Sequence, residues 1–218
     1  MKNYLLSLCF SMLAFSAHST LIAIDNCTGA ISCDITNTPP SLVEQNPNNG
    51  ILLAWDEVQN YTLMQDLVVD RVFDPAASFV EALPNGDFII KAGTIIASHY
   101  FQWDPGAGSS SRVEATIRLD SQVFAFITAD QNLFDSDFLG LPSVNYNNFG
   151  LRGLESGDTT VFNGPDVDIS WFAGSPGDWT RLITAYSPTA SVPEPNTLFL
   201  LSLAMFLLIS SKRKLYRN

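Results

Sequence analysis

The sequence has few cations, few histidines and few cysteines. Its 218 residues include 11 Lys or Arg against 22 Asp or Glu, with two His and three Cys. Binding to nucleic acid requires cations that neutralise phosphates, so this charge balance excludes nucleic acid as a partner. The acidic excess is compatible with divalent cations or basic partners, and it is also typical of a solvated surface that keeps a protein soluble.

The sequence also lacks an apolar run long enough to cross a bilayer comfortably. The run at 198–209 has twelve residues, interrupted only by Ser202, whereas a spanning helix needs about twenty. Three interpretations are open: a short anchor whose following cations reach the headgroups, a buried C-terminal helix, or a segment that is removed. A buried helix is disfavoured because the run is apolar all round and is followed by a cluster of cations.

The N-terminus has the three-part layout of a secretory signal. One Lys precedes an apolar stretch at 4–15, and small residues follow at Ala17 and Ser19. This pattern predicts a signal peptide over residues 1–19 that is cleaved after Ser19. Cleavage after Ser16 is the weaker alternative.

The C-terminus carries a second three-part signal. Pro193-Glu194-Pro195 precedes the apolar run, and Lys212-Arg213-Lys214 follows it. Together with the N-terminal signal, this order over residues 191–218 resembles the PEP-CTERM sorting domain of exported bacterial proteins. The resemblance implies a Gram-negative source and a precursor held in the inner membrane through 198–209. It also implies cleavage by an exosortase, which is a membrane-embedded cysteine transpeptidase, and delivery to the cell surface or an exopolysaccharide matrix.

Loss of both ends makes the remaining chain strongly acidic. Six cations and all 22 acids lie between Asp25 and Glu194, which gives this region a formal charge of −16. About 170 residues are left, enough for one domain with a proper core.

Two cysteines survive in this region. In an exported protein, Cys27 and Cys33 predict a small disulfide loop, although two free thiols or a metal or redox pair are alternatives. The segment after them is rich in Asn, Pro and Gly, so residues 20–50 are expected to form a loop-rich arm.

Residues 51–190 read as a series of short strands. Residues 112–119 alternate strictly between apolar and polar side chains, which predicts a half-buried strand with one face toward solvent. Residues 122–129 are apolar on both faces and predict a doubly covered strand, joined to its neighbour by a tight Asp120-Ser121 connection. Further strands are expected at 62–72, 87–103 with a break at Gly93, 159–162, 166–172 and 179–186.

These elements predict an all-β fold, either an antiparallel β-sandwich or a jelly roll. Residues 104–111 are expected to form a flexible hairpin connection, and a helical turn is expected within 130–140. The segments "GTIIASHYFQWDP", "FDSDFLG", "GLESGD" and "SPGDWTRLITAY" resemble exported, exosortase-dependent β-sandwich proteins with no assigned activity. That resemblance supplies no catalytic residues.

Catalytic chemistry has little support in the sequence. His99 is the single histidine left after export, and no Gly-x-Ser-x-Gly segment presents a nucleophile. We expect His99 to be a hydrogen-bonded, half-buried residue of a strand. One histidine and a disulfide leave no ligand set for zinc.

Carboxylates are the remaining groups that could bind a metal ion. Asp130, Asp135 and Asp137 cluster in the sequence, and Asp166 and Asp168 alternate. The first three are calcium candidates, because calcium takes carboxylate and carbonyl oxygens, although the EF-hand spacing fails. The competing interpretation is that they are turn and cap residues.

Aromatic residues offer a second route to function, through stacking on sugar rings. The candidates are Trp103, Trp171, Trp179, Tyr100 and Tyr146, although aromatics in a sandwich more often belong to the core. We therefore predict a non-enzymatic, exported surface or matrix protein without a cofactor. The alternatives are a carbohydrate-binding module assisted by calcium and a glycan hydrolase.

Overall fold

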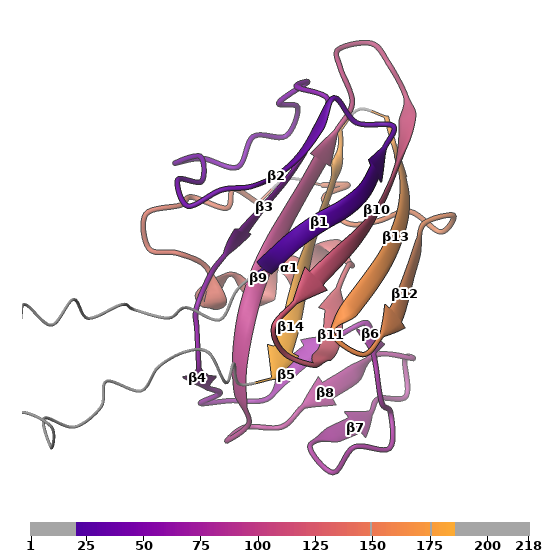
Figure 1. Cartoon of the computed structure of the whole chain (residues 1–218). Coiled ribbons are helices and arrows are strands. Elements are labelled where there is room, and N and C mark those ends of the chain that lie inside the picture. The colour runs from indigo at the N-terminus through magenta and orange to yellow at the C-terminus, as the bar shows by residue number, and fades with distance from the viewer. Residues whose placement is uncertain (1–20, 149, 175, 186–218) are drawn as a thin grey trace, which may run out of the picture. The chain divides into compact units, whose positions relative to one another are not determined.

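The computed structural model describes residues 21–148, 150–174 and 176–185. Within these ranges it contains fourteen strands, one α-helix, α1 (Asp130–Asp135), and one 3-10 helix, η1 (Asp137–Leu139) (Figure 1). This confirms the predicted all-β class and the helical turn. The expected signal peptide and sorting segment lie outside the described residues. Neither helix of the described part is long and apolar enough to cross a membrane.

One sheet has four antiparallel strands. Its order is β1 (Leu21–Thr28), β10 (Ser111–Leu119), β13 (Asp166–Ala173) and β12 (Thr159–Asn163). In β10 the apolar residues are buried and most of the polar ones are exposed, as the alternation predicted. The sheet therefore has one face for a core and one for solvent.

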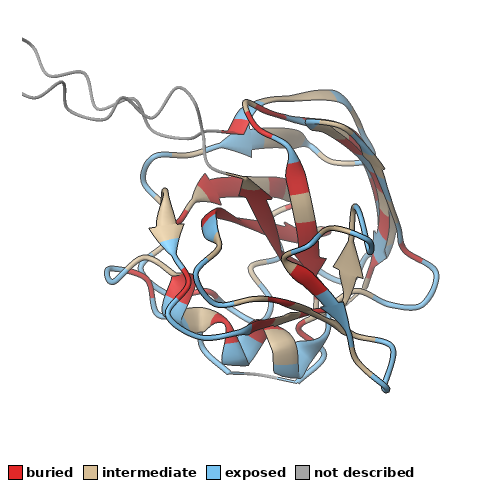
Figure 2. Ribbon diagram, turned by 90° about the horizontal axis from the view of Figure 1, so that it is seen from below, coloured by how far each residue is buried: buried red, intermediate tan, exposed pale blue. Residues whose placement is uncertain are grey.

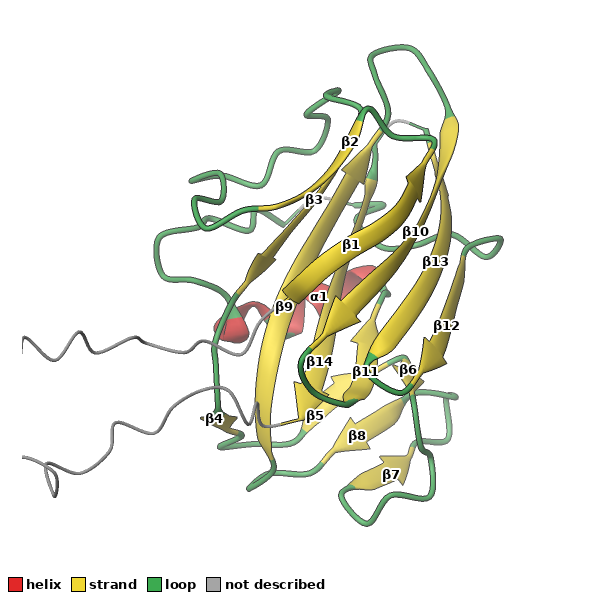
Figure 3. Ribbon diagram, viewed as in Figure 1, coloured by secondary structure: helices red, strands yellow, loops and turns green. Residues whose placement is uncertain are grey.

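The larger sheet has seven strands. Its order is β2 (Ser32–Ile35), β3 (Ile51–Asp56), β9 (Ile95–Asp104), β14 (Asp178–Ala185), β11 (Val123–Ile127) and β6 (Arg71–Val72), with β4 (Tyr61–Thr62) also beside β9. All its pairs are antiparallel except β2 with β3, which run parallel. A third sheet contains β5 (Leu67–Val69), β8 (Phe88–Ile90) and β7 (Val80–Ala82) (Figure 3).

Both faces of the seven-stranded sheet are covered. Its inner face packs on the four-stranded sheet and shares a core with it that includes Phe101, Trp103 and Trp171. Its outer face packs on α1, η1 and the three-stranded sheet, around residues such as Trp55 and Leu133. Figure 2 shows the buried residues concentrated on the strands between these layers.

Strand β14 therefore presents alternate residues to different cores. Leu182 belongs to the inner core, and Trp179 and Ile183 belong to the outer one. Because side chains alternate along a strand, Asp178 lies on the inner face and Arg181 on the outer face. Two charged residues three positions apart thus enter separate environments.

One predicted connection is wrong, and a second is present but leads to a different sheet. The 104–111 segment joins β9 to β10, and Asp120-Ser121 joins β10 to β11, but in each case the two strands belong to different sheets. Both are therefore crossings between packed sheets rather than hairpins. Turn residues show that the chain reverses and do not show whether it returns to the same sheet.

The expected N-terminal arm needs correction as well. Residues 21–28 and 32–35 form β1 and β2, so these parts of the expected arm belong to the sheets of the folded domain. Cys27 and Cys33 form the disulfide that joins these strands. Between them Gly29 has φ +80°, and a Cβ there would come within 1.8 Å of the Arg112 carbonyl oxygen, so glycine permits this close approach. Regular strands are absent between residues 36 and 50 of the described chain.

The predicted strand at 62–72 is divided among β4, β5 and β6. The expected break at Gly93 is confirmed: β8 and β9 lie on either side of it in different sheets.

Candidate functional site

A group of carboxylates lies at one end of the inner core. Strand β14 begins at Asp178, whose cross-strand partner is the inner-core residue Trp103. This register places the Asp178 carboxylate among apolar neighbours, and only 1% of the residue is exposed. Gly177 precedes it, and a Cβ at that position would come within 2.3 Å of the Trp103 carbonyl oxygen. The glycine therefore allows β14 to begin close against β9.

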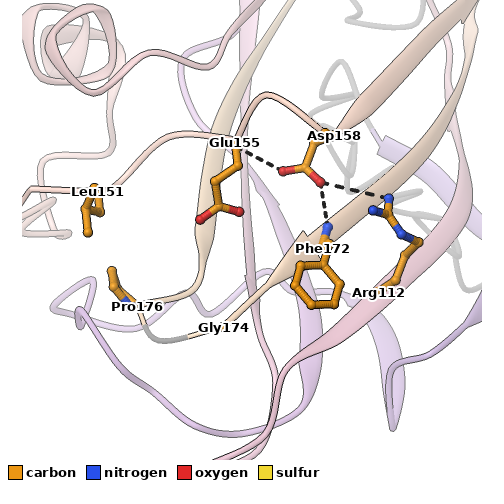
Figure 4. Close-up of a pocket in the computed structure, with 8 residues that line it drawn as sticks. Arg112, Leu151, Glu155, Asp158, Phe172, Gly174 and Pro176 are labelled. Carbon is orange, nitrogen blue, oxygen red and sulfur yellow. Dashed lines mark hydrogen bonds and ion pairs between the residues drawn. The ribbon is translucent and has the colours of Figure 1, made fainter.

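The loop before β12 supplies two more acids. Asp158 Oδ2 accepts from the Glu155 backbone N–H at 3.0 Å, and the Asp158 N–H donates to the Glu155 carbonyl oxygen at 3.1 Å. Asp158 Oδ1 accepts from the Phe172 N–H of β13 at 2.6 Å. In Figure 4, dashed lines join Asp158 to Glu155 and to Phe172, and the second bond attaches the loop to β13.

Glu155, Asp158 and Asp178 form the acidic cluster. They can place one carboxylate oxygen each so that all three lie within 4.8 Å of one another. Asp158 and Asp178 are buried, whereas Glu155 is exposed. The cluster thus extends from the inner core to the surface.

Arg112 is the cation of this region. Its Nη1 lies 3.9 Å from Asp158 Oδ1 and donates to the Ser170 carbonyl oxygen at 2.9 Å. Its guanidinium also lies 5.7 Å from the ring centroid of Phe172. One partly exposed guanidinium cannot neutralise three carboxylates.

The charge excess changes proton affinity. Burial, together with the negative charges of Asp158 and Glu155, raises the pKa of Asp178 to about 9. Burial and the neighbouring Asp158 also raise the pKa of Glu155. The cluster is thus a place where positive charge, as a proton or a metal ion, is stabilised.

A pocket of about 410 Å³ opens beside the acidic cluster (Figure 4). Its described lining is Arg112, Leu151, Glu155, Gly157, Asp158, Phe172, Gly174 and Pro176. A small ligand or an ion with its waters can enter it beside Glu155 and Asp158.

A second charged region, here called the arginine network, lies on the outer face of the same sheet. Arg181 is fully buried and donates to both carboxylate oxygens of Glu57, at 2.7 and 2.9 Å. It also donates to Ser136 Oγ at 2.6 Å and to Asp137 Oδ1 at 3.1 Å. Burial alone would lower the pKa of Arg181, but the Glu57 carboxylate raises it overall, so the pair is ionic.

Arg152 completes the network. It donates to both oxygens of Asp137, at 2.8 and 3.0 Å, and to the Tyr100 hydroxyl at 3.0 and 2.8 Å. Two arginines therefore face two carboxylates. This network is balanced in charge and fixes η1 against the large sheet.

The predicted calcium residues do not converge. Asp130 accepts from the backbone N–H groups of Leu151 and Gly153, Asp135 accepts from the Gln131 side chain, and Asp137 belongs to the arginine network. These bonds match the competing interpretation of turn and cap residues, and they do not bring the three calcium candidates together at one site. Within the described residues, the acidic cluster is the group that could hold a metal ion.

His99 has a structural environment. Its Nδ1 lies 2.6 Å from Asp56 Oδ1 and its Nε2 lies 3.2 Å from Thr184 Oγ1. The expected hydrogen bonding is confirmed, but the residue is fully buried rather than half-buried, since both faces of β9 are covered.

The aromatic candidates for sugar stacking all lie in the two cores. Trp103, Trp171, Trp179 and Tyr100 have no exposed surface, and Tyr146 has 5%. Buried rings cannot stack on a sugar. These five residues are therefore core residues and not sugar-binding residues. The sorting-motif residues lie outside the described part of the chain.

Sequence reasoning missed the acidic cluster and the arginine network. One available signal was Arg181, a lone charge within the strand "WTRLITA", because a buried charge needs a partner. A weaker signal was the placement of Asp158 directly before β12 and of Asp178 at the first position of β14. No family model, curated protein or solved structure matches the chain.

Proposed function

We propose that the chain is an exported, non-enzymatic β-sandwich protein of the cell surface or extracellular matrix, processed by an exosortase and associated with exopolysaccharide. The observation that carries this proposal is the order of the Pro193-Glu194-Pro195 triplet, the apolar run at 198–209 and Lys212-Arg213-Lys214. The N-terminal signal, with expected cleavage after Ser19, is its counterpart.

The boundaries of the strands support this proposal. Strand β1 begins at Leu21, just after the expected signal, and β14 ends at Ala185, before the sorting segment at 191–218. Removal of both ends would leave every described strand in place. Processing at these points is therefore compatible with a folded product.

Mass spectrometry of the protein from its native host tests the proposal. The expected product begins at Thr20 and lacks the basic tail. A variant with Pro193→Ala, Glu194→Ala and Pro195→Ala is the matched control, and it should keep residues up to Asn218. A wild-type protein that also ends at Asn218 in that host would contradict exosortase processing.

Calcium-assisted carbohydrate binding is the second candidate. One observation favours it: Phe172 is exposed at 46% and lines the pocket beside Arg112 and the acidic cluster. An exposed aromatic ring next to polar groups suits a sugar ring. A glycan array probed with calcium and with chelator tests this candidate, and the absence of any calcium-dependent signal would reject it.

The glycan hydrolase is the weakest candidate. A hydrolase needs two carboxylates that can both reach the glycosidic bond. In the acidic cluster only Glu155 is exposed, since Asp158 and Asp178 are buried. A substrate in this pocket would therefore meet one exposed carboxylate, Glu155, because the other lining acid, Asp158, is buried and bonded to backbone N–H groups.

A further inference from the structure

Buried carboxylates need a compensating partner. An ionised carboxylate out of water is strongly unfavourable unless it is paired, hydrogen-bonded or bound to a metal. In the acidic cluster, Asp158 has backbone donors for both of its oxygens. Asp178 differs, because its buried Oδ2 has no hydrogen-bond partner in the described structure. This oxygen is an observation separate from the proximity of the three acids.

The site also has more acidic groups than cationic groups to pair with them. Three carboxylates face one guanidinium, and Arg112 is shared with the Ser170 carbonyl and the Phe172 ring. When all three acids are ionised, as they would be around a metal ion, two formal negative charges remain uncompensated. A divalent cation would neutralise them, whereas a monovalent one would not.

The spacing of the oxygens is compatible with a calcium ion. Two ligands of one calcium ion are separated by at most roughly 4.6–5.2 Å, since Ca–O bonds are 2.3–2.6 Å long. The 4.8 Å limit for the three oxygens falls within this range. Magnesium demands near-ideal octahedral geometry and usually keeps several waters, so a site with three carboxylates favours calcium. The all-oxygen donor set is also typical of calcium rather than of zinc.

We propose that Glu155, Asp158 and Asp178 bind one calcium ion at the mouth of the inner core. The ion would connect the loop before β12 to the first residue of β14, so that it ties the four-stranded sheet to the seven-stranded sheet. The adjoining pocket admits the waters that complete six to eight oxygen ligands. This site does not depend on export or on exosortase processing.

Calorimetric titration of the full chain with CaCl2, after chelator treatment, tests the proposal. The expected result is one calcium ion per chain with a dissociation constant of roughly 10⁻⁵ to 10⁻³ M. Magnesium should bind more weakly. The variants Asp178→Asn and Glu155→Gln should each weaken binding by at least about tenfold. Glu155 is exposed, so its variant should fold even if the Asp178 variant does not.

Asp135→Asn is the matched control. Asp135 is an exposed acid whose carboxylate accepts from the Gln131 side chain, so this variant should bind calcium as the wild type does. Three outcomes would overturn the proposal: no saturable calcium binding, unchanged affinity in both cluster variants, or loss of binding in Asp135→Asn.

Discussion

Strand β14 carries Asp178 on its inner face and Arg181 on its outer face, and the two regions around them differ in charge balance. On the outer face, the arginine network pairs two guanidinium groups with two carboxylates through short hydrogen bonds. On the inner face, the acidic cluster sets three carboxylates against one distant guanidinium. A buried network with balanced charges needs no further ligand, whereas a buried cluster with excess negative charge requires a proton or a cation from solution.

Breaking the arginine network should have the largest effect. Replacing Arg181 by Met leaves Glu57 buried without its cation, which should lower the free energy of unfolding by about 3–5 kcal/mol. Urea denaturation measures this. Arg118→Met is the control, because the Arg118–Asp25 pair is exposed on both sides, and it should cost under about 1 kcal/mol. Equal losses in the two variants would contradict the special role of the network.

Adding calcium should have the next largest effect. At a hundredfold excess over the dissociation constant, one ion stabilises the folded state by about 2.7 kcal/mol, which corresponds to a rise of roughly 5–10 °C in Tm. Differential scanning calorimetry measures the shift between calcium and chelator. Tyr100→Phe removes a hydroxyl that Arg152 donates to and should keep the whole shift, because it lies in the other region. A shift lost in Tyr100→Phe would show that the two regions are not independent.

In the presence of chelator, replacing Asp178 by Asn should stabilise the folded protein, whereas most single substitutions destabilise it. The folded-state pKa of about 9 lies above the unfolded value, so Asp178 disfavours the folded state progressively as pH rises from about 4 to about 9. In chelator at pH 7, Asp178→Asn should therefore be more stable than the wild type by at least about 1 kcal/mol.

The Tm of this variant should also fall less steeply with pH than that of the wild type in chelator. The groups that act on Asp178 are Glu155, Asp158, Asp104 and Arg112. A wild-type Tm that is flat or rises between pH 5 and 8 would argue against an excess of buried negative charge.

The smallest effect is expected for an acid that belongs to neither region. Asp168 lies on the outward face of β13 and accepts from Thr116 Oγ1 at 2.7 Å. Asp168→Asn should change the free energy of unfolding by no more than about 0.5 kcal/mol, with the calcium shift retained. Urea denaturation measures this free energy. A larger loss would mean that removal of any acid is destabilising, and that burial and charge balance do not explain the effects expected in the two regions.

The sequence was informative where the pattern is local. The alternation at 112–119, the break at Gly93, the disulfide pair and the helical turn in 130–140 all depend on neighbouring residues, and the structure contains each of them. The 104–111 segment was misjudged as a hairpin, and the tight Asp120-Ser121 connection did not reveal a change of sheet, because the sheet to which a strand returns is set by distant pairing.

The candidate site could not be predicted for the same reason. Glu155 and Asp158 are separated from Asp178 by β12 and β13, and only the packing of two sheets brings them together. The calcium prediction instead followed nearness in sequence and selected Asp130, Asp135 and Asp137. The sequence correctly indicated abundant carboxylates, but their burial, which makes three of them unusual, depends on the tertiary structure.

Calcium anomalous scattering from crystals grown with excess CaCl2 tests the central claim most directly. The account predicts one peak between the carboxylates of Glu155, Asp158 and Asp178, and none beside Glu57 and Asp137 in the arginine network. A map without a peak in the acidic cluster, or with a peak only at Asp130 and Asp135, would contradict it.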